Sequence, residues 1–218
     1  MSIDEVGRAY RLRSVEYTAA LGSISDTAQQ DQDLISAWSR GIEGKVVDAG
    51  CGPGHWTNFL FGQGVTVEGL DMVDEFLDAA SARYPDVPFR GGTLEAMPYG
   101  DGSLSGILSW YSIIHTHPGE LDAVLSEFAR CVHPGGSILL GFFEGRHIEP
   151  FEHAVVRAYT WPVPAIRDAL AAAGFEMVET HSRTDQGHRP HAAMIARRGT
   201  QPQPGRCASA QSDPSRVA

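Results

Sequence analysis

The sequence is short of lysine, and it has no cluster of basic residues. Lys45 is the only lysine among 17 basic residues, and 27 acidic residues give the 218-residue chain a formal net charge of −10. Proteins that bind nucleic acids present a cationic face, which displaces counterions from the phosphates. We therefore expect neither DNA nor RNA as a partner.

Paired cysteines and long apolar stretches are also missing. Cys51, Cys131 and Cys207 lie far apart, so they form no CxxC motif and no disulfide framework. No apolar run reaches the roughly 18 residues of a membrane span, and residues 1–14 lack the apolar core of a signal peptide. We expect a cytoplasmic protein with reduced thiols and no membrane partner, and the sequence leaves its oligomeric state open.

The chain does contain enough apolar side chains for one folded domain. Apolar residues make up 42% of the sequence and charged residues 20%, which is typical of a globular chain. We divide the chain into an N-terminal helical lid (1–44), a main domain (45–198) and a tail (199–218). We expect the tail to be disordered because it has no periodic apolar pattern.

Short apolar runs alternate with helical patterns along the main domain, which predicts an α/β fold with three layers and a mostly parallel sheet. The segment 133–136, His-Pro-Gly-Gly, predicts a turn between a helix and the strand that follows it. The last two strands are joined only by 182–190, which is too short for a helical crossover, so they should be antiparallel. We expect strands at 45–49, 65–70, 87–90, 104–110, 137–143, 175–179 and 191–196, and helices at 31–39, 54–61, 73–84, 118–131 and 162–173.

A strand runs into a glycine-rich turn and then a helix in the segment 46–57, which reads VVDAGCGPGHWT. An open α/β sheet binds its ligand at such a point, because glycines let the backbone approach and the helix offers unpaired N–H groups. Asp71 follows the next strand, 21 residues after Gly50, at the spacing where a carboxylate accepts hydrogen bonds from ribose hydroxyls. Together these two features predict a cofactor that contains a nucleoside.

The details of the glycine turn separate one cofactor from another. The glycines are spaced G-x-G-x-G, and His55 stands where a dinucleotide fingerprint has its third glycine. Pro53 also removes a backbone donor that a pyrophosphate would use. No P-loop motif is present. A nicotinamide-dependent oxidoreductase therefore stands only as an alternative.

With this turn and with Asp71, the segment from about residue 40 to residue 197 resembles the class I S-adenosylmethionine-dependent methyltransferases, in particular those that act on small molecules. The resemblance implies a Rossmann-like seven-stranded sheet of order 3-2-1-4-5-7-6 whose last strand is antiparallel. It implies S-adenosylmethionine as cofactor and S-adenosylhomocysteine as product. Asp71 would then bind the ribose, Met72 would lie beside the adenine, and the turn would contact the methionine part through Asp48, Gly50, Cys51, Gly52 and Gly54.

A second loop carries the same resemblance with one departure. Segment 92–98, GTLEAMP, is similar to the family's G-D-A-x-x-L-P loop, which packs near the adenine. Thr93 replaces the Asp that usually accepts a hydrogen bond from the adenine amino group. Thr93, Glu95 or a water molecule then takes this role, and Leu94 and Ser109 are further expected cofactor contacts.

The N-terminal segment resembles a lid. Tyr10, Arg13 and Tyr17 are placed like the Tyr and Arg that close over the cofactor in small-molecule members of the family. Arg13 would pair with the methionine carboxylate. The alternative is an ordinary amphipathic helix with solvated arginines.

Methyl transfer from a sulfonium is an in-line displacement, so the enzyme has to hold a nucleophile about 3–3.5 Å from the methyl carbon and exclude water. A hydroxyl or ammonium acceptor also needs a base, for which histidine is suited. His115 and His117 follow the strand at 104–110, where they either act as acid/base or substrate contacts or stabilise the loop. No metal is expected, because an H-x-H pair lacks an acidic ligand cluster here. Aromatic residues near this edge either line an acceptor pocket or pack in the core: Trp56, Trp110, Tyr111, Phe142, Phe143, Tyr159 and Trp161.

These observations predict a methyltransferase that moves a methyl group to an oxygen or nitrogen of a small molecule. Residues 109–112 read SWYS, where family members that methylate base or glutamine amino groups often carry Asn-Pro-Pro-Tyr. A protein that binds the cofactor without turnover is a further alternative. No motif in the sequence selects the acceptor.

Overall fold

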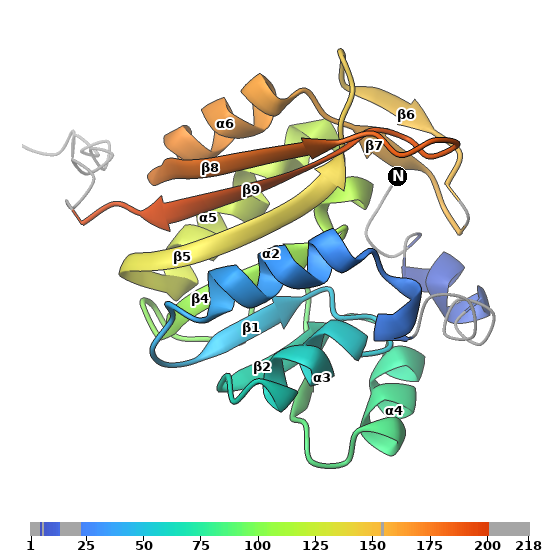
Figure 1. Ribbon diagram of the computed structural model, residues 1–218, viewed down its shortest axis with the longest axis vertical. Coiled ribbons are helices and arrows are strands. Elements are labelled where there is room, and N and C mark those ends of the chain that lie inside the picture. The colour runs from blue at the N-terminus through green and yellow to red at the C-terminus, as the bar shows by residue number, and fades with distance from the viewer. Residues whose placement is uncertain (1–4, 6, 14–22, 154, 201–218) are drawn as a thin grey trace, which may run out of the picture.

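The computed structural model describes residues 5, 7–13, 23–153 and 155–200 of the chain. A central sheet lies between two layers of helices (Figure 1). The seven strands of the sheet have the order β3-β2-β1-β4-β5-β9-β8. Their bounds are β1 Val46–Ala49, β2 Val67–Asp71, β3 Phe89–Gly91, β4 Leu104–Trp110, β5 Val132–Phe143, β8 Phe175–Arg183 and β9 His191–Arg198.

The pairing of the strands confirms the predicted topology. The pairs β1–β2, β2–β3, β1–β4 and β4–β5 are parallel, whereas β9 runs antiparallel to both β5 and β8. The order matches the expected 3-2-1-4-5-7-6 once the small hairpin β6–β7 is set aside. The parallel strands therefore bring their carboxyl ends to one edge of the sheet, where the glycine turn also lies.

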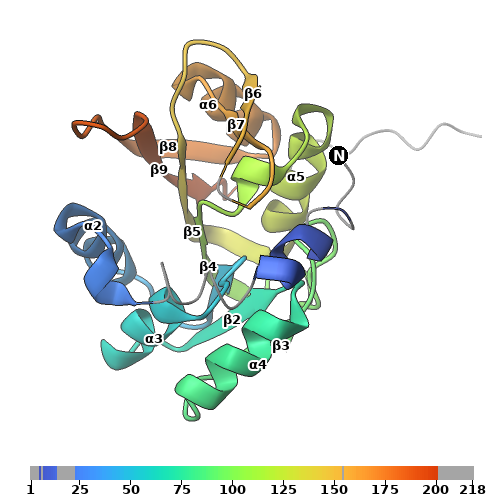
Figure 2. The ribbon, with the colours of Figure 1, turned by 90° about the vertical axis from the view of Figure 1, so that its right-hand side faces the viewer.

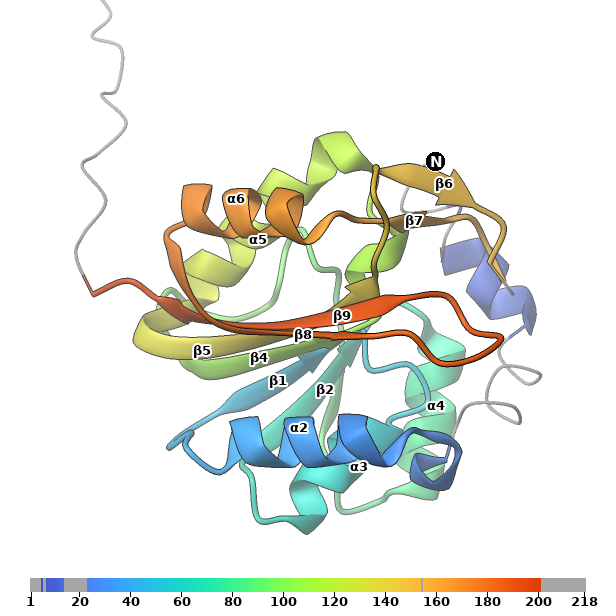
Figure 3. The ribbon, with the colours of Figure 1, turned by 45° about the horizontal axis from the view of Figure 1, so that its top comes forward.

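Helices cover both faces of the sheet (Figure 3). On one face, α2 (Gln29–Ser39) and α3 (His55–Gly62) bury Ile35 and Leu60 against strand residues such as Leu108. On the other face, α5 (Leu121–Cys131) and α6 (Val163–Ala172) pack on the neighbouring strand positions. Side chains alternate between the two cores because successive strand residues point to opposite faces. The remaining long helix, α4 (Asp74–Arg83), follows β2.

The N-terminal helical residues 7–13 lie at the carboxyl edge of the sheet, beside α4 (Figure 2). Tyr10 and Phe76 of α4 meet edge to face with their ring centroids 5.8 Å apart, and Arg11 pairs with Glu75 at 3.3 Å. The helix therefore sits over the edge at which the sequence places the cofactor. Its placement agrees with a lid, although the division of the chain at residues 44 and 198 stays a prediction.

The structure corrects one local prediction and adds one element that was not predicted. The segment 133–136 is no separate turn, because β5 begins at Val132 directly after α5. Val132 already pairs with Leu104, and the register then jumps to Gly106 opposite Ser137, so the extra residues form an irregularity within the strand. The second difference is an additional antiparallel hairpin, β6 (Glu149–Phe151) and β7 (Ala158–Thr160), between β5 and α6.

No helix in the described part of the chain is both long and apolar enough to cross a membrane.

Candidate active site

A pocket opens at the carboxyl ends of β1, β2 and β4, beneath the N-terminal helix. It has about 890 Å³ of space, including the part open to solvent. The predicted turn, the residues after β2, the loop after β3 and the residues after β4 all contribute to it. It is lined by Tyr10, Gly50, Gly52, Asp71, Met72, Val73, Phe76, Gly92, Thr93, Leu94, Glu95, Trp110, Tyr111, Ser112, His115, Thr116 and Glu120.

The glycine turn has the backbone conformation that only glycine adopts without strain. Gly50, Gly52 and Gly54 have φ angles of 80°, 52° and 78°. A Cβ atom on Gly50 would stand 2.3 Å from the Cβ of Ser112, so the pocket wall has no room for one. Gly54 is the N-cap of α3, where it lies beside Phe89, and it does not line the pocket. The turn thus brings bare backbone to the pocket at Gly50 and Gly52.

Asp71 braces this turn and still faces the pocket. One carboxylate oxygen accepts a hydrogen bond from the N–H of Gly52 at 2.8 Å, and the other accepts one from the N–H of Val73 at 3.0 Å. Burial raises the pKa of Asp71, and the backbone donors oppose this shift. Each oxygen keeps a lone pair for a further donor, which fits a pair of ribose hydroxyls.

Asp48 and Cys51 lie behind the turn and do not line the pocket. The hydroxyl of Thr57 donates a 2.6 Å hydrogen bond to the carboxylate of Asp48, and only 2% of the Asp48 surface is exposed. Burial raises the pKa of Asp48 to about 7, and the charge of Asp71 adds to the shift. Burial likewise raises the pKa of the Cys51 thiol, so this cysteine is a packed thiol and no nucleophile.

The loop after β3 contains a carboxylate oxygen that no hydrogen-bond donor of the described residues reaches. Thr93, Leu94 and Glu95 all line the pocket, and their contact with an adenine stays a prediction. Oε2 of Glu95 is buried and has no hydrogen-bond partner among the described residues. A buried carboxylate oxygen left in this state costs free energy, so the site is suited to a ligand that brings an N–H group.

Tyr10 and His115 meet across the pocket. The Tyr10 hydroxyl and His115 Nε2 are 2.6 Å apart, and His115 Nδ1 is 2.9 Å from the backbone oxygen of Arg157. A carbonyl oxygen only accepts, so Nδ1 carries a proton and donates it. Burial lowers the pKa of His115 to about 4, which leaves Nε2 unprotonated near neutral pH. Nε2 therefore accepts the hydrogen bond that Tyr10 donates.

Other predicted residues lie away from the pocket. Nδ1 of the exposed His117 accepts a hydrogen bond from the N–H of Gly119, and thereby caps the 3-10 helix Pro118–Glu120. Ser109 is buried with its hydroxyl 2.5 Å from that of Ser112, which itself lines the pocket. Arg13 is described but does not line the pocket, and Tyr17 lies outside the described residues.

Sequence reasoning missed part of the lining. Val73 is the N-cap of α4 and Phe76 lies in its first turn, so their spacing of three residues would have placed both on one side of the helix. Thr116 and Glu120 come from the short 3-10 helices after β4, which have no periodic pattern. Of the aromatic residues considered, Trp110 and Tyr111 line the pocket, whereas Trp56, Phe142, Tyr159 and Trp161 are buried in the cores and Phe143 packs against one of them.

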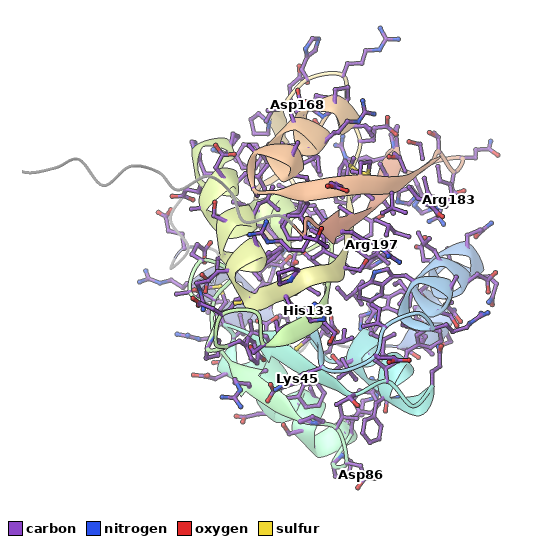
Figure 4. The ribbon with its side chains drawn as sticks, turned by 90° about the vertical axis from the view of Figure 1, so that its left-hand side faces the viewer. Lys45, Asp86, His133, Asp168, Arg183 and Arg197 are labelled. Carbon is purple, nitrogen blue, oxygen red and sulfur yellow. The ribbon has the colours of Figure 1, made fainter. Side chains whose placement is uncertain are left out.

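Tyr111 stands in a strained conformation at the end of β4. Its φ is 57°, and it is the one non-glycine residue with a positive φ in the described ranges. Its N–H donates to the backbone oxygen of Gly141, and its hydroxyl bonds Nδ1 of His191 on β9. Arg183 lies at the end of β8 (Figure 4). It donates a hydrogen bond to the same imidazole, and two of its nitrogens contact the two carboxylate oxygens of Asp31 in α2. Strain of this kind is found mainly at functional sites.

No group of three or more His, Cys, Asp and Glu side chains in the described ranges is arranged to hold a metal ion.

Comparison with known proteins matches part of the chain to a known family of domains. The profile of the methyltransferase domain matches residues 46–136, which include the glycine turn, Asp71 and the loop after β3. The malonyl-[acyl-carrier protein] O-methyltransferase of Erwinia billingiae is 31% identical over 147 residues, 66% of this chain and 57% of that protein. An uncharacterized methyltransferase of Synechocystis, sll0829, is 31% identical over 96 residues, 44% of this chain and 45% of that protein. The chain spans about half the length of these two relatives.

Solved structures have the same fold. The 1,6-didemethyltoxoflavin-N1-methyltransferase of Burkholderia thailandensis, solved with its substrate and S-adenosylhomocysteine, superposes with a TM-score of 0.73 at 21% identity, and the match covers 91% of each chain. The [4+2]-cyclase SpnF gives 0.75 at 16% identity, covering 90% of this chain and 96% of that one. At such identities the likeness shows the fold alone. The profile match thus assigns residues 46–136 to the methyltransferase domain family, and the solved structures share the fold of the surrounding chain.

Proposed function

We propose that this protein transfers the methyl group of S-adenosylmethionine to a small-molecule acceptor by in-line displacement. The observation that carries the proposal is the continuous pocket that joins the bare turn at Gly50 and Gly52, the carboxylate of Asp71 and the aromatic residues after β4. One part of this pocket suits a nucleoside cofactor and the other an acceptor. The lid helix over both parts keeps water from the reacting atoms.

The residues of the first part fit the cofactor. Gly50 and Gly52 approach its methionine part, and Asp71 accepts hydrogen bonds from the ribose hydroxyls. Met72 and Leu94 pack beside the adenine. When bound, the cofactor supplies a methyl group that is already activated on a sulfonium.

Glu95 takes the place of the Asp that the family has at position 93, and it accepts the hydrogen bond of the adenine amino group. Its buried Oε2 has no partner among the described residues, and the adenine amino group is a donor of the right kind. Thr93 lines the same part of the pocket and accepts more weakly, as a neutral hydroxyl. We therefore assign the adenine amino group to Glu95.

His115 acts as a positioning residue. Both of its ring nitrogens are engaged, and its pKa of about 4 makes it a poor base near neutral pH. It holds the hydroxyl of Tyr10 over the pocket and so fixes the lid helix. Nδ1 of His117 is engaged by Gly119, and we assign His117 to loop stabilisation.

Isothermal titration with S-adenosylhomocysteine tests the proposal, with NADH as the control ligand. We expect binding of S-adenosylhomocysteine alone, weakened at least about tenfold in Asp71→Asn, since the amide loses an acceptor that both the turn and the ribose use. Asp78→Asn, on the exposed side of α4, is the matched control and should bind normally. Binding of NADH alone, or of neither ligand, would contradict the proposed cofactor.

A further inference from the structure

The charged residues that line the pocket are all acidic. They are Asp71, Glu95 and Glu120, and the described lining contains neither Lys nor Arg. Asp71 and Glu95 belong to the part of the pocket that we assign to the cofactor. Glu120 is therefore the one charged side chain that the described lining offers to an acceptor, and its charge favours a cation over a carboxylate.

Tyr10 has a fixed hydrogen-bond polarity. Its single hydroxyl proton is donated to His115 Nε2, since Nδ1 of that imidazole already donates to the backbone of Arg157. The phenolic oxygen therefore offers only lone pairs to a ligand in the pocket. The Tyr10 oxygen can therefore accept a hydrogen bond from an N–H group of the molecule that is to be methylated.

Aromatic rings form the wall on the side of the pocket that follows β4. The rings of Trp110 and Tyr111 meet edge to face at 5.6 Å, and Tyr10 and His115 do so at 5.3 Å. The hydroxyl of Tyr111 is engaged by His191, which leaves its ring as the contact surface. Aromatic faces attract a desolvated ammonium or a flat apolar body. Glu120 stands at the exposed rim of this wall.

From the charge of Glu120, the accepting hydroxyl of Tyr10 and the aromatic wall, we infer that the methyl acceptor is an amine on an apolar or aromatic body. This inference rests on the proposed function and names its substrate class. Tyr10 accepts a hydrogen bond from the amine, the rings hold its apolar part, and Glu120 attracts its positive charge to the mouth of the pocket.

The reaction balances with these groups alone. The ammonium form loses one proton to water at the rim beside Glu120, and the free lone pair on nitrogen attacks the methyl carbon. A nitrogen–carbon bond forms while the sulfur–carbon bond breaks, and sulfur keeps the electron pair of the broken bond. The product leaves as a methylated ammonium together with S-adenosylhomocysteine.

The same lining is unsuited to oxygen nucleophiles. A hydroxyl has to lose its proton in the transition state, and His115, with both nitrogens engaged, is not available as its base. A carboxylate acceptor would meet the negative charge of Glu120 and no Lys or Arg of the described lining. A neutral amine needs neither a strong base nor a cation.

Three probes of matched shape test the inference: phenethylamine, 2-phenylethanol and phenylacetate. Their binding is measured by titration into the protein saturated with S-adenosylhomocysteine. We expect phenethylamine to bind about tenfold more tightly than the alcohol, and phenylacetate not to bind in the millimolar range. Glu120→Gln should weaken the amine several-fold and leave the alcohol unchanged. Tyr10→Phe also releases the lid helix from His115, and it should weaken the amine more than the alcohol.

Matched controls separate these effects from a general loss of structure. Asp122→Asn, two residues beyond Glu120 on the exposed side of α5, and Tyr84→Phe, at the end of α4, should behave as the unmodified protein. Equal binding of amine and alcohol, tighter binding of phenylacetate, or failure of phenethylamine to bind would each overturn the inference. Failure of S-adenosylhomocysteine to bind in the first step would instead contradict the proposed function.

Discussion

Replacement of Asp48 by Asn should make the protein more stable at neutral and alkaline pH. Asp48 lies behind the glycine turn, 2% exposed, with a single side-chain donor, the hydroxyl of Thr57 at 2.6 Å. Burial raises its pKa from 3.8 to about 7, and the nearby Asp71 adds to the shift. Asn keeps the shape and an oxygen that accepts from Thr57, but it never ionises.

The sign and size follow from this raised pKa. Below the unfolded value of 3.8 both states are protonated, and above about 7 both are ionised. Between these limits the folded state holds the proton more tightly, so the stability contributed by protonation is lost as the pH rises. The full shift corresponds to about 4 kcal/mol, of which roughly 1.5 kcal/mol is lost by about pH 5 and the rest by about pH 8.

Urea denaturation at these two pH values measures the effect. The stability difference between Asp48→Asn and the unmodified protein should grow by about 2.5 kcal/mol from about pH 5 to about pH 8. The subtraction removes the titration of all other groups, and Asp86→Asn, at the surface before β3, is the matched control (Figure 4). A difference that does not change with pH would refute the reasoning, because Asp48 would then be ionised in the folded protein at both values.

Three further predictions follow from the site and the sheet. Gly50→Ala should abolish binding of S-adenosylhomocysteine in a titration, because its Cβ would collide with Ser112, whereas Gly64→Ala has a similar φ of 83° with open space and should bind normally. Glu68→Gln should lower the free energy of unfolding by about 2 kcal/mol in urea denaturation, because this buried carboxylate holds two cations and a phenol; an unchanged midpoint would contradict that role. If His115 is a neutral positioning residue, kcat/KM should not change between about pH 5.5 and 8 through titration of His115. A change of kcat/KM in this range that disappears in His115→Asn would instead show that His115 acts as a base.

The sequence was sufficient for features that depend on neighbours along the chain. The strand at 104–110 has the same bounds in the structure, and the glycine turn and Asp71 meet because parallel strands end at one edge. Helical spacing also placed α5 within three residues, and α6 within one residue, of their observed bounds.

Features that depend on distant residues were beyond the sequence. Tyr10 and His115 are 105 residues apart, and only their meeting in space, together with the backbone oxygen of Arg157, decides which nitrogen accepts. The hairpin β6–β7 has strands of three residues, too short for a periodic pattern. The 133–136 segment contains every residue of a turn, yet the pairing of Val132 with Leu104 draws it into the sheet.

A crystal structure of the complex with S-adenosylhomocysteine tests the central claim most directly. The account predicts the ribose hydroxyls within hydrogen-bond distance of Asp71, the adenine amino group on Oε2 of Glu95, and the sulfur facing the wall of Trp110 and Tyr111. A ligand bound outside this pocket, or bound in it with its ribose away from Asp71, would contradict the account.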